Sequence, residues 1–393
     1  MKKTYSGKAI IRAGETLIDS NISINSSEFE SAMDVLSYWR LIHETPLSNA
    51  QKIVESEALK IDKSAFTAKR LKRYVSIVNK LKRFNDMKLK NMQDIGGCRV
   101  VVSNTKKLTQ LIRSLRRRPE FKSSAGFVRH KDYISNPKED GYRSYHLIGR
   151  FRDIQNAEKN IEVQLRTRLQ HDWATALEIV DIFTKQKLKS NQGDKKWSSF
   201  FKYVSEQFSI MESIHLLSID NPKTWNAYLE KVLSRPESYE SCIAAQKLIK
   251  ELSVVKKFEA FTHSLNFVDG QLEKIPKEKY GFVLINVDLS KSQIQLEFFE
   301  EKNVENAERS YIECEKRIAG RNDYVAALVS TTAVDGIKEA YPNYFADSSE
   351  FLRHLILISA APIQNERANL IDKITDPIIK FVLNLVNRLT KTF

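Results

Sequence analysis

The segment Ile161–Glu178, IEVQLRTRLQHDWATALE, constrains the fold of this chain more than any other. Its first six residues alternate between apolar side chains and the polar Glu162, Gln164 and Arg166, as in a β-strand with one buried face. The following residues predict a helix that carries His171. The sequence therefore predicts a strand that passes into a helix and presents a carboxylate on its polar face. The alternative for that carboxylate is an ordinary solvated charge.

A second carboxylate precedes another predicted strand, in the segment Asn91–Val102, NMQDIGGCRVVV. Asp94 lies in a polar turn, and two glycines that allow close backbone approach lead from it into the apolar run Cys98–Val102. Alone, this is a common entry from a turn into a buried strand. Together, Asp94 and Glu162 could supply two carboxylates to Mg²⁺, which is usually held by one or two carboxylates plus substrate phosphates.

Basic residues upstream of Asp94 fit a phosphate-binding site. Lys72, Ser76 and Lys80 are spaced four residues apart, so a helix over this segment would place them on one face. The apolar face of that helix would carry Leu71, Val75, Val78 and Leu81. The alternative is a basic helix face that contacts only solvent.

The segment Asn136–Phe151 predicts a turn followed by an alternating strand. Tyr142, Ser144 and His146 would then share one face of that strand. An aromatic ring with a histidine four residues later can stack on a base and contact a phosphate. The alternative is an ordinary half-buried strand.

Four motifs in this order along the chain together resemble the RelA/SpoT nucleotide pyrophosphokinase domain. They are RxKxxxSIxxK (Arg70–Lys80), DIGGCR (Asp94–Arg99), PKEDGYRSYH (Pro137–His146) and EVQLRT (Glu162–Thr167). The resemblance covers about residues 30 to 215. Enzymes of this family transfer the βγ-pyrophosphate of ATP to a ribose 3′-hydroxyl. The resemblance implies an α+β fold in which a mixed β-sheet is flanked by helices.

The resemblance also implies how ATP is bound. The residues that would bind it are Arg70, Lys72, Ser76, Lys80 and Arg99, with the two arginines stacking on the adenine and the other three holding the phosphates. Asp94 would bind Mg²⁺, and Glu162 would bind Mg²⁺ or take the proton from the attacking hydroxyl. Pyrophosphoryl transfer needs alignment and charge neutralisation more than covalent help.

The acceptor site follows from the same resemblance. Its residues would be Lys138, Tyr142, His146, Gln164 and His171, with Tyr142 stacking on the acceptor base. The His171–Asp172 pair lies inside the synthetase motif and therefore does not indicate a metal-dependent hydrolase. We expect no hydrolysis of the product.

Composition frames these expectations. The chain has 393 residues, 42% of them hydrophobic, enough for two or three domains with real cores. Cys98, Cys242 and Cys314 are far apart, form no metal-binding pattern and favour a reducing compartment. No apolar run resembles a signal peptide or a membrane span. We therefore expect a cytoplasmic protein without a membrane partner.

Positive charge is concentrated in one part of the chain. Residues 61–122 contain 18 Lys or Arg against 4 Asp or Glu, whereas basic and acidic residues balance in the remainder. ATP needs only a few of these charges, so the surplus indicates a polyanionic partner such as RNA. The run Arg116, Arg117 and Arg118 would contact it. The alternative is a solvated helix face.

Two acceptors remain open, along with one function of a different class. The first acceptor is the 3′ CCA end of tRNA, whose modification would stop translation. The second is GDP or GTP, which would give the alarmone (p)ppGpp. The QHDWA and GYRSYHL segments resemble toxic small alarmone-synthetase-like proteins, some of which modify tRNA. The function of a different class is a catalytically silent nucleotide- or RNA-binding regulator, and intact Asp94 and Glu162 argue against it.

The order of elements predicts four parts. These are an N-terminal segment (1–30), the synthetase-like domain (31–216), a connector (217–239) and a small α+β regulatory domain with C-terminal helices (240–393). We expect strands at Tyr280–Asp288, Gln293–Glu300 and Asp323–Ser330, and helices at Glu240–His263, Val304–Ile318, Ser348–Leu357 and Leu370–Leu389.

The last part contains Tyr341-Pro342-Asn343-Tyr344, two tyrosines three residues apart. This element resembles one in fused toxin–antitoxin members of the family, the CapRel-type phage-defence proteins. The resemblance implies that Tyr341 and Tyr344 occupy the ATP site and inhibit the enzyme until a phage protein binds. The alternative is a surface turn packed by two tyrosines.

Overall fold

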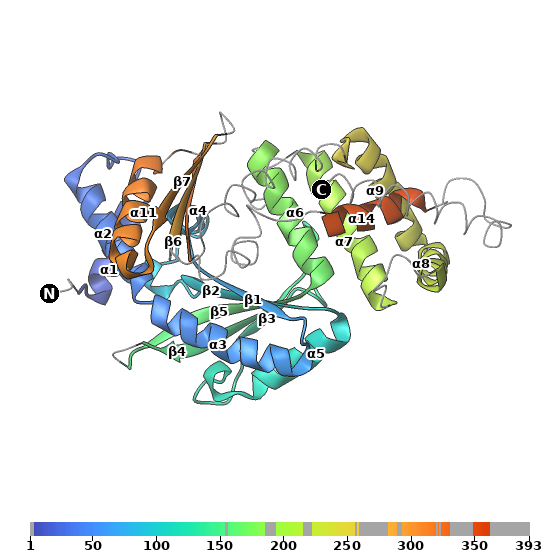
Figure 1. Ribbon diagram of the computed structural model, residues 1–393, viewed down its shortest axis with the longest axis horizontal. Coiled ribbons are helices and arrows are strands. Elements are labelled where there is room, and N and C mark those ends of the chain that lie inside the picture. Colours follow the sequence, from blue (N-terminus) through green and yellow to red (C-terminus); the bar gives the residue numbers. More distant parts are fainter. Residues whose placement is uncertain are drawn as a thin grey trace.

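A five-stranded mixed β-sheet carries the predicted motifs (Figure 1). The computed structural model describes residues 4–153, 156–184, 194–214, 222–255, 258, 282–288, 293–319, 321, 324–330 and 349–361. The strands are β1 (Phe66–Leu71), β2 (Gly96–Val102), β3 (His130–Asp132), β4 (Tyr145–Arg152) and β5 (Glu158–Thr167), in the spatial order β1-β2-β5-β4-β3. β2 and β5 are parallel, and the other neighbours are antiparallel. The predicted α+β fold, a mixed sheet flanked by helices, is confirmed.

The register of the strands separates a polar face from an apolar one. Gly97 pairs with Arg70 on one side and with Glu162 on the other. Arg99 pairs with Gln164. Paired residues point to the same face of a sheet, and successive residues of a strand point to opposite faces. These four polar side chains therefore share one face, as the alternation in β5 predicts.

The apolar face packs against α3 (Glu44–Ile61) and α5 (Thr105–Arg117), which lie along the lower side of the sheet in Figure 1. The buried residues of the two helices recur at helical spacing and are Leu47, Ala50, Val54, Ala58, Leu108, Leu111 and Leu115. They pack on the strand residues Val100, Val102, Val163 and Leu165. Each buried Val or Leu side chain contributes about 1.5–3 kcal/mol by burial, so this face stabilises the sheet.

A second core joins the N-terminal helices to the element that follows β1. It contains α1 (Gly7–Thr16), α2 (Ser27–Leu41), α4 (Tyr74–Arg83) and the short helix η1 (Leu89–Asn91). Ser6 and Ser26 begin α1 and α2 by accepting hydrogen bonds from backbone N–H groups of the first turns. A further short helix, η2 (Pro119–Phe121), follows α5.

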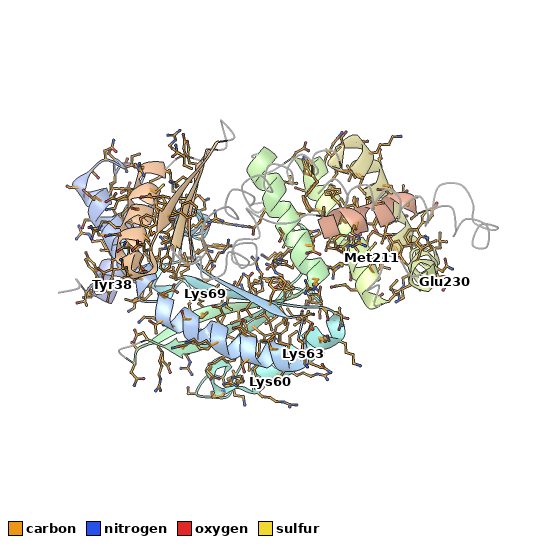
Figure 2. All side chains as sticks on the ribbon, viewed as in Figure 1. Tyr38, Lys60, Lys63, Lys69, Met211 and Glu230 are labelled. Carbon is orange, nitrogen blue, oxygen red and sulfur yellow. The ribbon has the colours of Figure 1, made fainter. Side chains whose placement is uncertain are left out.

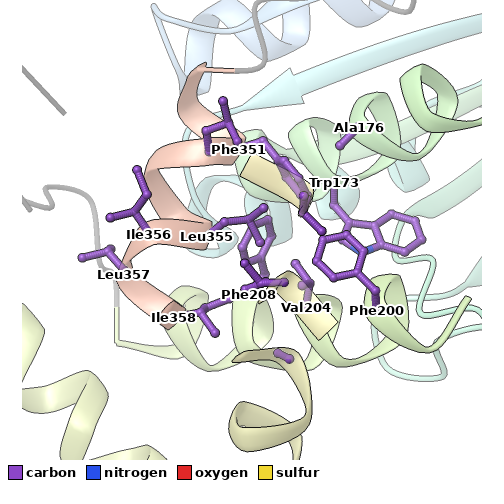
Figure 3. Packing of buried hydrophobic residues seen from close by; sticks show 14 of the residues in the cluster. Trp173, Ala176, Phe200, Val204, Phe208, Phe351, Leu355, Ile356, Leu357 and Ile358 are labelled. Carbon is purple, nitrogen blue, oxygen red and sulfur yellow. The ribbon is translucent and has the colours of Figure 1, made fainter. Parts of the chain in front are cut away.

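A helical core follows the sheet. It comprises α6 (Arg168–Thr184), α7 (Lys195–Ser213), α8 (Pro222–Ser234), α9 (Pro236–Glu251) and, from the C-terminal part, α14 (Ser349–Ala360). Figure 3 shows Phe351 and Leu355 of α14 packed beside Phe208 of α7. The helix expected at Ser348–Leu357 is confirmed. The one expected at Glu240–His263 ends earlier, at Glu251.

The C-terminal part also contains a three-stranded antiparallel sheet. Its strands are β6 (Phe282–Asp288), β7 (Gln293–Phe299) and β8 (Tyr324–Ser330), in the order β7-β6-β8, with η4 (Glu301–Asn303) and α11 (Val304–Ile318) between β7 and β8. The strands and the helix expected here are confirmed. α11 lies against the sheet on one side and contacts α2 on the other, as Figure 1 shows.

Some expectations fall on residues that the structure does not describe. Tyr341, Tyr344 and the helix predicted at Leu370–Leu389 lie outside the described residues. The boundaries predicted near residues 30, 216 and 239 stay predictions. Within the described part of the chain, every helix is too short or too polar to cross a membrane.

Candidate functional site

Asp94 lies in the turn between η1 and β2, at the start of the polar face. Lys72 Nζ donates to its Oδ2 at 2.7 Å, and Lys80 Nζ donates to its Oδ1 at 2.8 Å. The carboxylate is largely buried, and both lysines are partly covered. One carboxylate is thus held between two ammonium groups from different elements.

The prediction that Lys72 shares a helix with Ser76 and Lys80 is wrong. β1 continues to Leu71, and the Lys72 backbone N–H donates to the Ile95 carbonyl at 2.7 Å. α4 begins two residues later, so Lys72 belongs to the turn between β1 and α4. This turn brings its side chain to the same carboxylate as Lys80. Ser76 is exposed in the first turn of α4.

The lysine–carboxylate cluster has an excess of positive charge. Burial lowers the pKa of Lys72; Asp94 opposes this shift, while Lys80 and Arg70 add to it. Burial raises the pKa of Asp94, but the two lysines outweigh it and hold that pKa below its usual range. Two lysines therefore act on one carboxylate, and Arg70 acts on one of these lysines, an arrangement suited to an additional polyanion such as a chain of phosphates.

Arg70 and Arg99 lie on neighbouring strands of the same face. Burial, and next the charge of Arg166, lower the pKa of Arg99 to about 9, so its guanidinium is still protonated near neutral pH. The Nε atom of Arg99 is buried and has no hydrogen-bond partner among the described residues. A guanidinium plane can stack on a planar ligand and donate to it. The structure thus brings the two predicted adenine-binding arginines to one face, beside Lys72.

Five side chains of β4, β5 and the turn before β4 form a closed ring on the polar face. We call Glu162, Gln164, Arg166, Tyr142 and His146 the hydrogen-bond ring. Gln164 Nε2 donates to Glu162 Oε1 at 2.7 Å. Arg166 Nη2 donates to Gln164 Oε1 at 3.0 Å and to Tyr142 Oη at 2.8 Å. Tyr142 Oη lies 2.8 Å from His146 Nε2, and His146 Nδ1 closes the ring at 3.5 Å from Glu162 Oε1.

Charges within the ring set its protonation. Burial raises the pKa of Glu162, but His146 and Gln164 outweigh burial and lower it to about 2. Burial lowers the pKa of His146, while Tyr142 and Glu162 raise it above its ordinary value. Burial raises the pKa of Tyr142, but Arg166 and His146 lower it to about 7. Glu162 is therefore a carboxylate near neutral pH.

Two carboxylates of the site suit Mg²⁺. Lys72 lowers the pKa of both Asp94 and Glu162, so its ammonium group acts on both of them. No group of three or more His, Cys, Asp or Glu side chains in the described ranges could hold a metal ion. A cation here would therefore need substrate oxygens in addition to the two carboxylates, which is how Mg²⁺ commonly binds with nucleotides.

The turn before β4 positions Tyr142 and Lys138. Gly141 has a φ of 89°, and a Cβ atom on it would lie 2.9 Å from the Cβ of Ser205, so a larger residue would not fit. Lys138 is exposed, and its Nζ lies 4.7 Å from the centre of the Tyr142 ring. A cation and an aromatic ring, both predicted to bind the acceptor, thus lie together.

The predicted arrangement of Tyr142, Ser144 and His146 on one strand face is wrong. β4 begins only at Tyr145, so Tyr142 lies in the preceding turn. Ser144 is buried, and its Oγ donates to the Leu165 carbonyl at 3.2 Å. Tyr142 and His146 still meet, because the turn folds the tyrosine back over the strand.

His171 lies on α6 and is buried against Phe66, with ring centres 5.4 Å apart. Burial, followed by the charges of Arg99 and Arg166, holds its pKa well below the ordinary value, so the ring is neutral near pH 7. Its Nδ1 has no hydrogen-bond partner among the described residues. The structure places this histidine near the guanidinium groups of the site, while its predicted contact with the acceptor stays a prediction.

The basic run at the end of α5 lies on the other side of the sheet. α5 packs on the apolar face, away from the hydrogen-bond ring. Arg118 pairs with Glu57 at 3.3 Å and with Glu120 at 3.0 Å. Glu57 also pairs with Lys60, which Figure 2 labels below the sheet. The RNA contacts of Arg116 and Arg117 stay predictions, and Arg118 is held by carboxylates.

Sequence reasoning assigned no role to Arg166. The alternation in β5 already places it on the same face as Glu162 and Gln164, so the signal was present. The sequence did not predict its hydrogen-bond partner Tyr142, because this tyrosine lies in a turn more than 20 residues earlier in the chain.

Comparison with known proteins agrees with this site. Residues 69–186 match the family described as "Region found in RelA / SpoT proteins". The matched region contains every predicted site residue from Arg70 to His171.

Two relatives from Bacillus subtilis (strain 168) are similar over this part. GTP pyrophosphokinase YwaC is 33% identical over 118 residues, covering 28% of this chain and 54% of the relative. GTP pyrophosphokinase YjbM is 33% identical over 115 residues, covering 28% and 53%. The chain thus spans about half the length of these curated relatives.

The solved structures include small alarmone synthetase 1 from Bacillus subtilis bound to its product pppGpp. It is 24% identical, with 45% of this chain and 93% of that chain covered and a TM-score of 0.37. Small alarmone synthetase 2 from the same organism is 24% identical, with 46% and 95% covered and a TM-score of 0.38.

Proposed function

We propose that this chain is an ATP-dependent pyrophosphokinase that transfers the βγ-pyrophosphate of ATP to a ribose 3′-hydroxyl. The observation that carries the proposal is the pairing of Lys72 and Lys80 with Asp94 on the sheet face that also holds Glu162. The RelA/SpoT family match over the same residues supports it. So do the names of the two curated relatives.

The charge balance of the site suits a triphosphate donor. When the phosphates arrive, Lys72 and Lys80 exchange Asp94 for phosphate oxygens. Asp94 and Glu162 would hold Mg²⁺, which would neutralise charge on the phosphates. Arg70 and Arg99 stack on the adenine. Ser76, in the first turn of α4, donates to a phosphate.

The attacking hydroxyl is oriented from the other end of the site. Tyr142 stacks on the acceptor base, while Lys138 and His146 contact its phosphate and sugar. Glu162 is ionised, so its carboxylate can accept a hydrogen bond from the 3′-hydroxyl and would also be a ligand for Mg²⁺. Gln164 fixes that carboxylate by donating to Oε1.

For the acceptor itself, we propose the 3′ end of tRNA, with inhibition of translation as the consequence. The excess of basic residues in 61–122 supports a polyanionic acceptor. GDP or GTP is the second candidate, because both curated relatives are named GTP pyrophosphokinases.

We further propose that the C-terminal part inhibits the enzyme until a partner, such as a phage protein, binds. The sequence element at Tyr341 and Tyr344 supports this role. α11 and α14 support it as well, because each packs on elements of the first half of the chain. Tyr341→Ala with Tyr344→Ala should make expression toxic without a phage protein, and adding Glu162→Gln should remove the toxicity. Unchanged growth in cells that accumulate the folded double variant would contradict inhibition by these tyrosines.

The activity is tested by incubating the full chain with γ-labelled ATP and Mg²⁺, adding GDP, GTP or deacylated tRNA in separate reactions. Label on tRNA supports the first acceptor, and label on a guanine nucleotide supports the second. The Glu162→Gln variant, of nearly identical shape, should transfer to neither. Wild-type protein that binds ATP but labels no acceptor would support the silent-regulator alternative.

A further inference from the structure

Arg166 is the most buried charged member of the hydrogen-bond ring, with 4% of its surface exposed. One atom, Nη2, donates both to Tyr142 Oη and to Gln164 Oε1. Its guanidinium carbon lies 5.1 Å from the centre of the Tyr142 ring. No carboxylate pairs with it among the described residues. Burial of such a charge is costly, so hydrogen bonds to two site residues call for a functional explanation.

Both arms of the ring end on one oxygen of Glu162. Gln164 donates to Oε1, and His146 lies 3.5 Å from the same atom. Oε2 accepts no hydrogen bond from any described residue. A carboxylate fixed through one oxygen presents the other in a defined direction. The ring therefore aims Oε2 without occupying it.

We propose that Arg166 is a positioning residue that fixes both ends of the acceptor subsite together. Through Tyr142 Oη it sets the plane on which the acceptor base stacks. Through Gln164 it sets the direction of Glu162 Oε2, to which the acceptor hydroxyl is presented. One side chain, Arg166, thereby sets the spacing between the ring that stacks on the base and the carboxylate oxygen that receives the hydroxyl. This spacing corresponds to the distance between the base and the reacting hydroxyl of a nucleotide. This inference rests on the proposed function.

The geometry requires a guanidinium at this position. A planar guanidinium reaches the tyrosine and the glutamine in fixed directions, whereas the lysine ammonium group is a point charge on a flexible stem. Arg166→Lys should therefore retain the charge but lose part of the positioning. Arg166→Gln should lose both.

The kinetic test uses the full chain with its identified acceptor. Arg166→Gln should lower kcat by about tenfold or more while the KM for ATP stays unchanged, because the donor residues lie on β1, β2, α4 and the turn between β1 and α4. Arg166→Lys should give an intermediate kcat. Tyr142→Phe removes only the hydroxyl that Arg166 binds. Combining it with Arg166→Gln should cost less than the two single losses multiplied together, because both act through one contact.

The matched control is Arg168→Gln. Arg168 is two residues further along the same segment, but it is exposed and donates to the Ser64 carbonyl at 2.9 Å. Loss of a basic residue there should leave kcat and both KM values unchanged. A fall in kcat equal to that of Arg166→Gln would assign the effect to general loss of positive charge and overturn the proposal.

A second measurement does not depend on activity. The charged groups around Tyr142 are Arg166 from β5, His146 from β4 and Lys138 from the turn, and its pKa is about 7. Ultraviolet difference titration of the folded protein should show one tyrosine ionising near neutral pH. Tyr142→Phe should abolish that step, and Arg166→Gln should move it to higher pH because the cation that stabilises the phenolate is gone.

The two measurements separate the possible failures. A wild-type chain that labels no acceptor but shows the tyrosine step contradicts the proposed function and leaves the ring intact. A tyrosine titration that is identical in the wild type and in Arg166→Gln contradicts the ring. If folded Arg166→Gln keeps the wild-type kcat, Arg166 is only a structural residue. The same conclusion follows if the effects of Arg166→Gln and Tyr142→Phe on kcat simply multiply in the double variant.

Discussion

Two regions of this molecule bury charged side chains, and they do so differently. Between α2 and α11, Arg40 pairs with Glu315, and each has only 6–7% of its side chain exposed. Tyr311 Oη accepts from Arg40 Nη2 at 3.0 Å and donates to Glu315 Oε1 at 2.7 Å. In the site, by contrast, Lys72 and Lys80 share one carboxylate, and Arg166 has none among the described residues.

The electrostatic consequences are opposite. Burial alone would lower the pKa of Arg40, but Glu315 and Tyr311 more than reverse this and raise it. The pKa of Lys72 is lowered instead, because one carboxylate does not offset burial and the charges of Lys80 and Arg70. Balanced buried charge joins two parts of a fold. Unbalanced buried charge is stabilised when a ligand of opposite sign arrives, which is the pattern expected of a binding site for an anionic ligand.

The largest expected effect is on stability, in the balanced region. Arg40→Ala leaves the Glu315 carboxylate buried without its cation and should lower the free energy of unfolding by about 3–5 kcal/mol. Urea unfolding of the full chain measures this loss. The double variant Arg40→Met, Glu315→Leu should be more stable than Arg40→Ala, because it leaves no unpaired buried charge. Equal losses in the two variants would mean that packing, and not charge pairing, joins α2 to α11.

The next effect is on chemistry, in the unbalanced region. Glu162→Gln should lower pyrophosphate transfer on the order of a hundredfold to a thousandfold, because the carboxylate charge near the reacting groups is lost. The variant should stay folded but lose stability at neutral pH, because the ionised carboxylate contributes to stability there. The pKa of Glu162 is lowered to about 2, so its charge contributes stability above the pKa of the unfolded chain and loses it as the pH falls towards 2. The difference in unfolding free energy between wild type and variant should therefore shrink below pH 4. A variant that unfolds at neutral pH would show that this carboxylate is structural.

Sequence patterns predicted those features of the two regions that depend only on neighbouring residues in the chain. The alternation in β5 placed Glu162 and Gln164 on the polar face, and pairing with β2 confirmed it. The four-residue spacing of Lys72, Ser76 and Lys80 suggested one helix, yet pairing of β1 with β2 keeps the chain extended through Leu71. The spacing correctly predicted only that Lys72 and Lys80 lie close together, where both donate to Asp94.

Contacts between distant segments could not be predicted. Arg40 and Glu315 are 275 residues apart, and each lies on an amphipathic helix where a charge is ordinarily solvated. The contact of Arg166 with Tyr142 could not be predicted for the same reason, because the two residues are distant in the chain. The tyrosine comes from a turn and not from the predicted strand. Periodicity tells which face a side chain takes, but it does not tell which other element covers that face.

A smaller effect is expected at the acceptor end of the site. Tyr142→Ala should weaken acceptor binding by about 1–3 kcal/mol through lost base stacking. The KM for ATP should hardly change, because Tyr142 lies outside the segment from β1 to α4 that carries Arg70, Lys72 and Lys80. Tyr142→Phe is the control, since it keeps the ring and removes only the hydroxyl. A larger change in the KM for ATP than in that for the acceptor would place this tyrosine in the donor site.

The smallest effect concerns the basic end of α5, which belongs to neither buried region. Arg116→Ala with Arg117→Ala should reduce the slope of log affinity for tRNA against log salt concentration by at most about two, because each lost phosphate contact releases about one counterion fewer. Transfer to GDP or GTP should stay unchanged. Arg118→Ala is the matched control, because this arginine already pairs with Glu57 and Glu120, and its loss should leave the slope as it is.

α5 covers the apolar face of the sheet, so an RNA that contacts α5 must also pass the edge of the sheet to reach Glu162. If the double variant has the wild-type slope, the basic run is a solvated helix face, and the case for tRNA as the acceptor loses its electrostatic support.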